Sequence, residues 1–224
     1  NNQRYFPNYI DRVNRQYLPK SFKETGAILA TRRSFVNEYS RLGTNIDLVE
    51  VSRQESVDID NYEDWWIAEN YLQKKKIAIV VNAYGKIGTG HVYWCLSIAS
   101  KLVFHEGLFF LNENHQLGID IIDGHNYAYK TYRDEAHLFE LLREFNPHIV
   151  VNDILDTTEE YISALKNDGY FVVNFEDLGT GTDVADVVFD ALYEHDLVKN
   201  NIYTGHKYYI LKDEFYFQPQ KIIT

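Results

Sequence analysis

The segment from Gly85 to His91 joins three glycines to a histidine, a combination that could hold an anion beside a general base. Glycines let the backbone turn sharply and approach a ligand closely. Free N–H groups at a helix start favour a phosphate, and they tend to keep a nearby histidine neutral, which suits a base. The spacing G-x-x-G-x-G is neither a dinucleotide fingerprint nor a P-loop. A functional turn and a plain tight connection are therefore equally good interpretations.

Two pairs of polar residues, Asn152-Asp153 and Glu176-Asp177, follow apolar runs that read as strands. Because ligands bind at the carboxyl ends of strands in open α/β sheets, both pairs are expected near His91. For Asp153 and Asp177, a helix cap or loop hydrogen bond is an equally good interpretation, and for the other two it is favoured. No histidine spacing indicates a metal site, and no G-x-S-x-G elbow supports acyl transfer.

The elements that would position these residues alternate between strand and helix after Lys76. The apolar run 77–81 is typical of a central parallel strand buried on both faces. Helices are expected over about 91–104, 134–145 and 157–167, and further strands over 108–111, 148–151, 171–174, 187–189 and 208–211. This alternation predicts an α/β domain over residues 76–215, with a parallel Rossmann-like sheet and helices on both faces.

The run Lys74–Lys76 separates this domain from a different N-terminal part, residues 1–73. Short strands are expected there over 26–31 and 46–51, with a weak helix over 33–42. A second helix over 62–74 would be capped by Asp60 and Asn61. The sequence predicts a small α+β segment before the larger domain.

The amino-acid composition limits which binding partners and which cellular compartment are expected for this chain. The chain has 33 Asp+Glu against 22 Lys+Arg, a net charge of 22 − 33 = −11, which argues against nucleic acid and against an anionic membrane. One cysteine, Cys95, and no signal peptide or membrane span fit a reducing cytoplasm. There is no Met, even at position 1, so we expect a piece of a longer protein.

The segment KIAIVVNAYGKIGTGHVYWCLSIASKL resembles the opening of the UDP-sugar hydrolase of pseudaminic acid biosynthesis and its relatives in spore-coat polysaccharide synthesis. More distantly it resembles the glycosyltransferase that adds N-acetylglucosamine in peptidoglycan synthesis. Three later stretches are similar to the hydrolase family's further motifs, so the resemblance covers roughly Lys76 to Phe215: HIVVNDILDTTEEYISAL, VVNFEDLGTGTDVADVVFDAL and YTGHKYYILKDEF.

This resemblance implies half of a glycosyltransferase-B fold and hydrolysis at the anomeric carbon of a UDP-linked deoxy-diacetamido sugar, with no cofactor. His91 matches the base that activates water. The residues implied in contacting or orienting the substrate are Gly88, Thr89, Gly90, Asp153 and Asp177. In the family, UDP is held mainly by a C-terminal domain, which we expect to be missing from these 224 residues. We therefore expect this chain alone to have little or no activity.

Four positions depart from the family pattern. Val80 and Asn82 replace an Arg-x-Asp at the end of the first strand, Trp94 replaces an arginine in the first helix, and Leu155 replaces a tyrosine. The changes at Val80, Asn82 and Trp94 favour an alternative in which the hydrolase-like part is a non-catalytic module.

The stretches NRQYLPKSFKETGAILATRRSF and SVDIDNYEDWWIAENYL are similar to the C-terminal part of acylneuraminate cytidylyltransferases, which make CMP-sialic acids from CTP. This resemblance places Asp58 and Asp60 near a divalent-metal site, with Mg²⁺ as the expected ion. It places Arg15 and Gln16 near the sugar. Helix capping is an equally good interpretation of the two aspartates, and Thr25 replaces the family's asparagine.

Both resemblances belong to nonulosonic (sialic-, pseudaminic- or legionaminic-like) acid pathways. They predict a segment of a fused bacterial enzyme that acts on a nucleotide sugar, either a UDP-sugar or a CMP-sugar. Two alternatives stay open: the non-catalytic module, and a protein whose only chemistry is cytidylyl transfer. A homodimer is consistent with the cytidylyltransferase resemblance alone.

Overall fold

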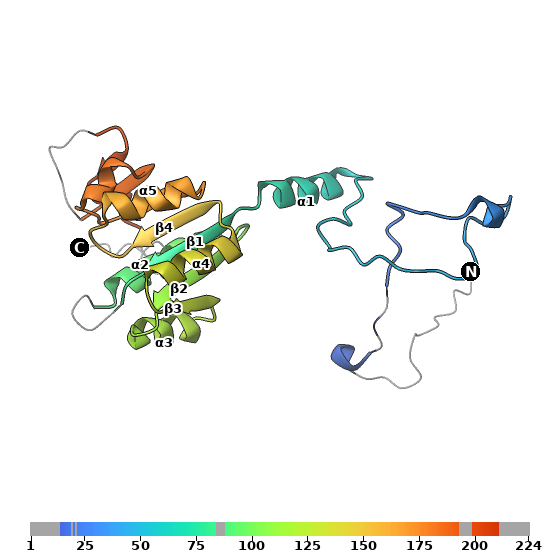
Figure 1. The fold of residues 1–224 in the computed structure, drawn as a ribbon, viewed down its shortest axis with the longest axis horizontal. Coiled ribbons are helices and arrows are strands. Elements are labelled where there is room, and N and C mark those ends of the chain that lie inside the picture. The colour runs from blue at the N-terminus through green and yellow to red at the C-terminus, as the bar shows by residue number, and fades with distance from the viewer. Residues whose placement is uncertain (1–13, 19, 21, 84–87, 193–198, 211–224) are drawn as a thin grey trace, which may run out of the picture. The chain divides into compact units, whose positions relative to one another are not determined.

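The structure is a computed structural model, and it describes residues 14–18, 20, 22–83, 88–192 and 199–210. Contacts divide the chain into two units, Asn1–Leu72 and Gln73–Thr224 (Figure 1). The second unit holds the α/β domain and every buried hydrophobic residue found in the described part of the chain.

The first unit contains less secondary structure than the sequence predicts. Its described residues form two short 3-10 helices, Arg15–Tyr17 and Arg33–Phe35, and all but the last residue of the helix α1, Tyr62–Gln73. The strands expected over 26–31 and 46–51 and the longer helix over 33–42 were wrong predictions. An alternating pattern becomes a strand only when another strand takes its hydrogen bonds, and no described residue of this unit supplies one.

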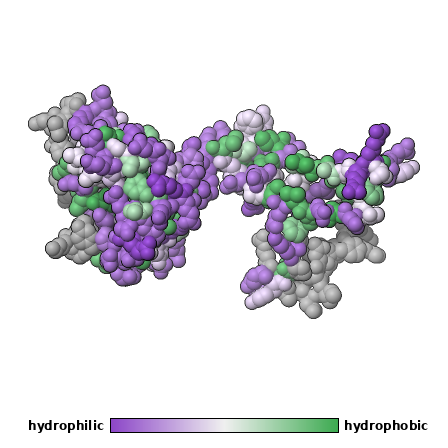
Figure 2. Space-filling model, viewed as in Figure 1, coloured by the Kyte–Doolittle hydropathy of each residue, from purple (hydrophilic) through white to green (hydrophobic). Residues whose placement is uncertain are grey.

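Apolar side chains of the first unit remain on its surface. Ile28 is 91% exposed and Val49 is 89% exposed, and hydrophobic residues are visible over α1 and the segments before it (Figure 2). The start of α1 is nevertheless well formed. Asn61 Oδ1 accepts the N–H groups of Glu63 and Asp64, and the Asp64 carboxylate accepts those of Asp60 and Asn61. This reciprocal arrangement is a capping box.

A parallel sheet forms the centre of the second unit. Its strands are β1 (Lys76–Val81), β2 (Glu106–Asn112), β3 (Tyr129–Tyr132), β4 (Ile149–Asp153), β5 (Phe171–Phe175), β6 (Val187–Asp190) and β7 (Ile202–Thr204). Their order is β3-β2-β1-β4-β5-β6-β7, and every pairing is parallel.

Helices cover both faces of this sheet (Figure 1). Helices α2 (Gly90–Lys101) and α3 (Gln116–Gly124) pack on the face that receives Ile77, Ile79 and Val81 from β1. Helices α4 (Glu135–Phe145) and α5 (Glu159–Asn167) pack on the face that receives Ala78 and Val80. The two cores follow from the alternation of side chains along a strand. The doubly wound, Rossmann-like α/β fold expected from the sequence is confirmed.

The edges of the sheet differ from prediction. The helix α3 and the strand β3 were not predicted, and the last strand was expected at 208–211. The structure has β7 earlier, at Ile202–Thr204, followed by a 3-10 helix at His206–Tyr208, while residue 211 lies outside the described residues. Edge strands are short and only partly buried, so they lack the continuous apolar run that identifies a central strand. Every helix in the described part is too short or too polar to cross a membrane.

Candidate active site

The strand order reverses between β1 and β4, and the candidate residues meet at this point. β1 leads into α2 on one face, whereas β4 leads into α5 on the other. Val81 and Asp153 lie opposite each other at the carboxyl ends of the two strands. Open α/β sheets bind their ligands at such a switch point.

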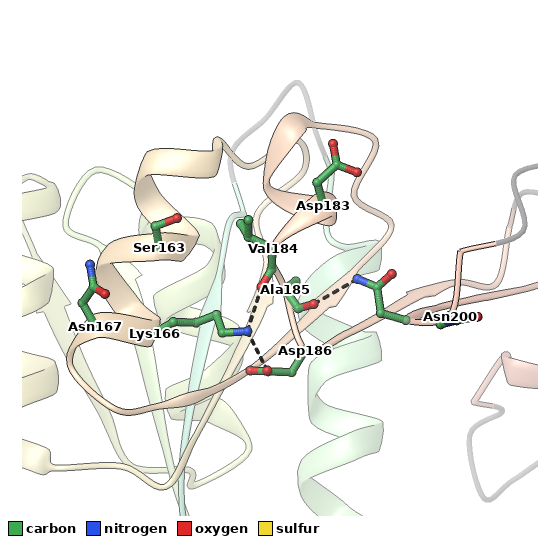
Figure 3. Close-up of a pocket in the computed structure, with 9 residues that line it drawn as sticks. Ser163, Lys166, Asn167, Asp183, Val184, Ala185, Asp186 and Asn200 are labelled. Carbon is green, nitrogen blue, oxygen red and sulfur yellow. Dashed lines mark hydrogen bonds and ion pairs between the residues drawn. The ribbon is translucent and has the colours of Figure 1, made fainter.

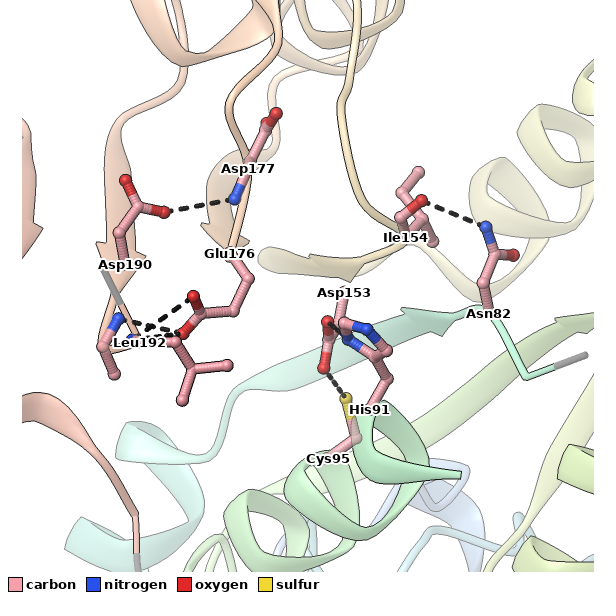
Figure 4. Close-up of polar contacts among 10 residues, drawn as sticks. Asn82, His91, Cys95, Asp153, Ile154, Glu176, Asp177, Asp190 and Leu192 are labelled. Atoms are coloured by element: carbon pink, nitrogen blue, oxygen red, sulfur yellow. Dashed lines mark hydrogen bonds and ion pairs between the residues drawn. The ribbon is translucent and has the colours of Figure 1, made fainter. Parts of the chain in front are cut away.

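His91 and Asp153 form a close pair across this point (Figure 4). The distance from His91 Nδ1 to Asp153 Oδ1 is 2.5 Å, and the side chains are 19% and 2% exposed. The main-chain N–H of Asn82 donates to the carbonyl of Asp153 and ties the end of β4 to β1. Within the described residues, the imidazole of His91 makes its hydrogen bond through Nδ1.

The carboxylate changes the acid–base behaviour of His91. The hydrogen bond with Asp153 raises the pKa of His91 above its ordinary value, although burial opposes the rise. The helix N-terminus was expected to favour the neutral imidazole; the Asp153 carboxylate acts in the opposite direction, and a full charge at hydrogen-bond distance outweighs a dipole end of about half a charge. Burial also raises the pKa of Asp153, and the hydrogen bond with His91 opposes that rise.

Cys95 is a third member of this group, and it was not predicted as a site residue. Its thiol donates to Asp153 Oδ2 over 3.5 Å, so the two oxygens of the carboxylate meet two side chains of one helix. The signal in the sequence was the i, i+4 spacing of His91 and Cys95, which places both on one face of α2. Recognising it also required knowing that β4 lies next to β1.

The starts of α2 and α3 have no side-chain cap, unlike the starts of α1, α4 and α5. The side chains of Asn61, Asp134 and Thr158 accept N–H groups at the starts of α1, α4 and α5. Thr89 precedes α2 but makes no side-chain cap, and Gly88 has a left-handed φ of 82°. The first N–H groups of α2 therefore suit an anion next to His91. Residues 84–87 of the glycine-rich turn, Gly85 included, lie outside the described residues.

Asp177 has a different environment from Asp153. Its buried carboxylate accepts the N–H and hydroxyl of Thr157 at 2.9 and 2.6 Å, the Asn174 amide at 2.6 Å and the Gly179 N–H at 2.8 Å. With four donors on two oxygens, it has little capacity left for a ligand. This geometry supports the loop hydrogen bond over the substrate-orienting role.

A buried polar ladder continues from this loop into the sheet. Asn152 and Asn174 stand in register on β4 and β5, and the Asn152 amide donates to Asn174 Oδ1 at 2.9 Å. The Tyr161 hydroxyl of α5 donates to Asn152 Oδ1 at 3.0 Å. These contacts join β4 to β5 and to α5 near the carboxyl ends of the two strands.

Two glycines after Asp177 pack against Thr157 with no space for a side chain. A Cβ at Gly179 would lie 2.1 Å from the Thr157 carbonyl oxygen, and one at Gly181 would lie 2.0 Å from its hydroxyl oxygen. The Gly179 contact is with backbone, so it cannot be relieved by a rotamer change.

The Gly179→Ala variant should therefore be clearly less stable than the wild type. We expect a loss of free energy of unfolding at or above the usual overpacking cost of about 1–3 kcal/mol, measured by urea denaturation. Gly124→Ala is the matched control, because no atom lies within 4 Å of its Cβ position. Equal stability of Gly179→Ala and the control would contradict the packing described above.

Glu176 joins the end of β5 to the segment after β6. It has a left-handed φ of 51°, and its carboxylate accepts the N–H groups of Ala191 at 2.9 Å and Leu192 at 3.3 Å (Figure 4). Burial raises the pKa of this carboxyl. The loop contact favoured for Glu176 in the sequence analysis is confirmed.

The four positions that depart from the hydrolase family carry no cation. Val80 is fully buried in the core under α4 and α5. The Asn82 amide donates to the Ile154 carbonyl at 3.1 Å, and Leu155 adopts a left-handed φ of 70°. Trp94 packs against Phe175 and Tyr209, with ring centroids at 5.9 and 4.5 Å. Its indole nitrogen is buried without a hydrogen-bond partner in the described part of the chain.

Four candidate residues belong to the first unit. Asp58 and Asp60 are both exposed, and the cap of α1 is Asn61 rather than either of them. Arg15 and Gln16 lie in the first 3-10 helix, where Gln16 is exposed. Among the residues that the structure describes, no three His, Cys, Asp or Glu side chains are grouped to hold a metal ion. The Mg²⁺ site stays a prediction.

Two hollows lined by described residues of the second unit do not include His91 among their lining residues. One, of about 640 Å³, is open and lies at the amino end of β6 beside the last turn of α5 (Figure 3). There Lys166 pairs with Asp186 at 2.7 Å and also donates to the Val184 carbonyl. The other, of about 270 Å³, is lined by Asp177 and Lys199. The paired charges of the larger hollow and its place at the amino ends of the strands do not mark a ligand site.

No family model matches the sequence. The chain is 26% identical over 163 residues to an uncharacterized protein of Methanocaldococcus jannaschii, a match that covers 66% of this chain and 33% of the relative. The chain therefore spans about a third of that curated relative. It is also similar to the crystal structure of MurG from Acinetobacter baumannii, with a TM-score of 0.46 and 11% identity, over 58% of this chain and 44% of that one.

The sheet topology and the candidate site define the structural class of the second unit. The second unit is a doubly wound α/β domain with a histidine–aspartate pair at its switch point.

Proposed function

We propose that the second unit is the catalytic half of an enzyme that hydrolyses a nucleotide sugar, with His91 as the base that activates water. The observation that carries this proposal is the His91–Asp153 pair at the switch point, beside the uncapped start of α2. The order of motifs described from the sequence supports a glycosyltransferase-B type of enzyme and a UDP-sugar as the substrate.

The geometry supports separate roles for His91, Asp153 and the start of α2 in the proposed reaction. Asp153 holds the Nδ1–H of His91, so that the unprotonated Nε2 faces the ligand edge and takes a proton from water. The water oxygen bonds to the anomeric carbon as the bond from that carbon to the diphosphate oxygen breaks, and UDP departs with the electron pair. Asp153 stabilises the resulting imidazolium. The N–H groups at the start of α2 favour the anionic diphosphate.

A non-catalytic module is the second candidate. It is favoured by the neutral residues Val80, Asn82 and Trp94 where the hydrolase family has charged ones. Such a module would bind no nucleotide sugar at the switch point. For the first unit, the cytidylyltransferase resemblance remains a separate proposal, in which Asp58 and Asp60 hold Mg²⁺ and CTP is the substrate of the longer protein.

Calorimetric titration distinguishes these possibilities. We expect the chain to bind UDP-N-acetylhexosamine, because the main-chain groups at the start of α2 and His91 lie together at one edge. A His91→Ala variant should bind more weakly, whereas His137→Ala on α4 is the control and should bind like wild type. The same titration with CTP and Mg²⁺ examines the first unit. Absence of UDP-sugar binding would move the proposal to the non-catalytic module.

A further inference from the structure

Cys95 contacts the carboxylate that holds His91, and its thiol has no role in the water activation described above. We propose that Cys95 is a positioning residue, whose thiol fixes the plane of the Asp153 carboxylate so that Oδ1 remains directed at His91. This inference rests on the proposed role of His91 as a base. Its test uses no substrate, so the two proposals can fail separately.

The contacts support a fixed carboxylate. Nδ1 of His91 lies 2.5 Å from Oδ1 of Asp153, and Sγ of Cys95 lies 3.5 Å from Oδ2, the weaker contact expected of a thiol donor. Both donors stand on one rigid element, one turn apart on the same face of α2. The main chain of Asp153 is fixed separately, by the β1–β4 ladder and by the N–H of Asn82.

The remaining freedom of Asp153 is rotation of its side chain. The terminal torsion of an aspartate has a broad preference, so a fixed backbone alone does not decide which oxygen meets His91. A single donor would hold one oxygen and leave the other buried without a partner, an arrangement that proteins avoid. In the described part of the chain, the donors to this carboxylate are His91 and Cys95.

The thiol stays protonated and can act as a donor throughout the neutral range. Cys95 is completely buried, and burial raises the pKa of its thiol well above the ordinary value. The charged groups that face His91 are Asp153 from β4 and, at longer range, Glu176 from the end of β5. Neither is a donor that could replace the thiol at Oδ2.

A packing role for Cys95 makes the opposite prediction for the pKa of His91. Cys95 belongs to the apolar core under α2, together with Val92 and Leu96. If the thiol only fills space, its removal leaves the carboxylate in place with one fewer donor, and its undiminished charge keeps or further raises the pKa of His91. If the thiol positions the carboxylate, its removal lets Oδ1 turn away and that pKa falls.

The experiment is an NMR titration of the histidine rings in the full chain, with the His91 signals assigned from a His91→Gln variant. We expect Cys95→Ala to lower the pKa of His91 toward its ordinary value and to mix its ring tautomers. Cys95→Ser retains a donor and should restore the wild-type titration. Val92→Ala truncates a fully buried neighbour on the same helix and should leave the titration unchanged.

An unchanged or raised pKa of His91 in Cys95→Ala would overturn the proposal, as would a failure of Cys95→Ser to restore it. Circular dichroism shows whether each variant is folded. If Cys95→Ala does not fold, Cys95→Val fills the space without supplying a donor and is judged by the same titration.

Discussion

In an Asp153→Asn variant, the pKa of His91 is expected to fall toward its ordinary value, and the stability supplied by the pair is expected to disappear. The carboxylate raises the pKa of His91 in the folded state. The stabilisation is therefore fully present below the unfolded pKa of about 6.5 and is lost as the pH rises through the folded value. Each unit of difference between the folded and the unfolded pKa of His91 corresponds to about 1.4 kcal/mol in the free energy of unfolding.

The burial of Asp153 makes the free energy of unfolding depend on pH in the same direction. Because burial raises the pKa of this carboxyl, its ionised form is costly once His91 has become neutral. The free energy of unfolding of wild type minus that of Asp153→Asn should therefore decrease steadily with rising pH.

Urea denaturation between about pH 5 and pH 9, the range in which a histidine changes charge, measures this difference. In a His91→Gln background, the part of the difference that titrates near the His91 pKa should be absent. A difference independent of pH in both backgrounds would show that the two side chains are not coupled.

The central strands could be predicted from the sequence because their burial on both faces requires a continuous apolar run. β1 and β4 have such runs, and the prediction places them within one or two residues of their observed ends. β3 and β7 lie at the two edges of the sheet and are short, so no such run identified them. In the first unit, residues 46–51 do alternate between apolar and polar side chains, but the described residues of that unit provide no neighbouring strand.

The site was partly predictable for a similar reason. His91, Asp153 and Asp177 all stand after predicted strands, so the sequence could not choose between the two aspartates. Asp153 continues β4 with its side chain on the same face as Val151, toward α2. Before Asp177, the left-handed Glu176 redirects the chain, and the carboxylate turns into its own loop. A left-handed residue that is not glycine has no reliable sequence signal.

Replacing His91 is expected to have the largest effect on catalysis. In the longer protein, with a nucleotide-binding domain present, His91→Ala should abolish cleavage of the sugar–UDP bond, since a general base contributes about 10²- to 10⁴-fold to the rate. Measurable binding should survive, because the N–H groups at the start of α2 belong to the main chain. His91→Asn should behave in the same way, since an amide cannot take the proton.

Release of UDP from a UDP-sugar, followed side by side for wild type, His91→Ala and the control His137→Ala of the longer protein, tests the central proposal most directly. We predict turnover by the wild type and the control, and none above background by His91→Ala although the ligand still binds. Turnover by His91→Ala at the wild-type rate would contradict the assignment of His91 as the base.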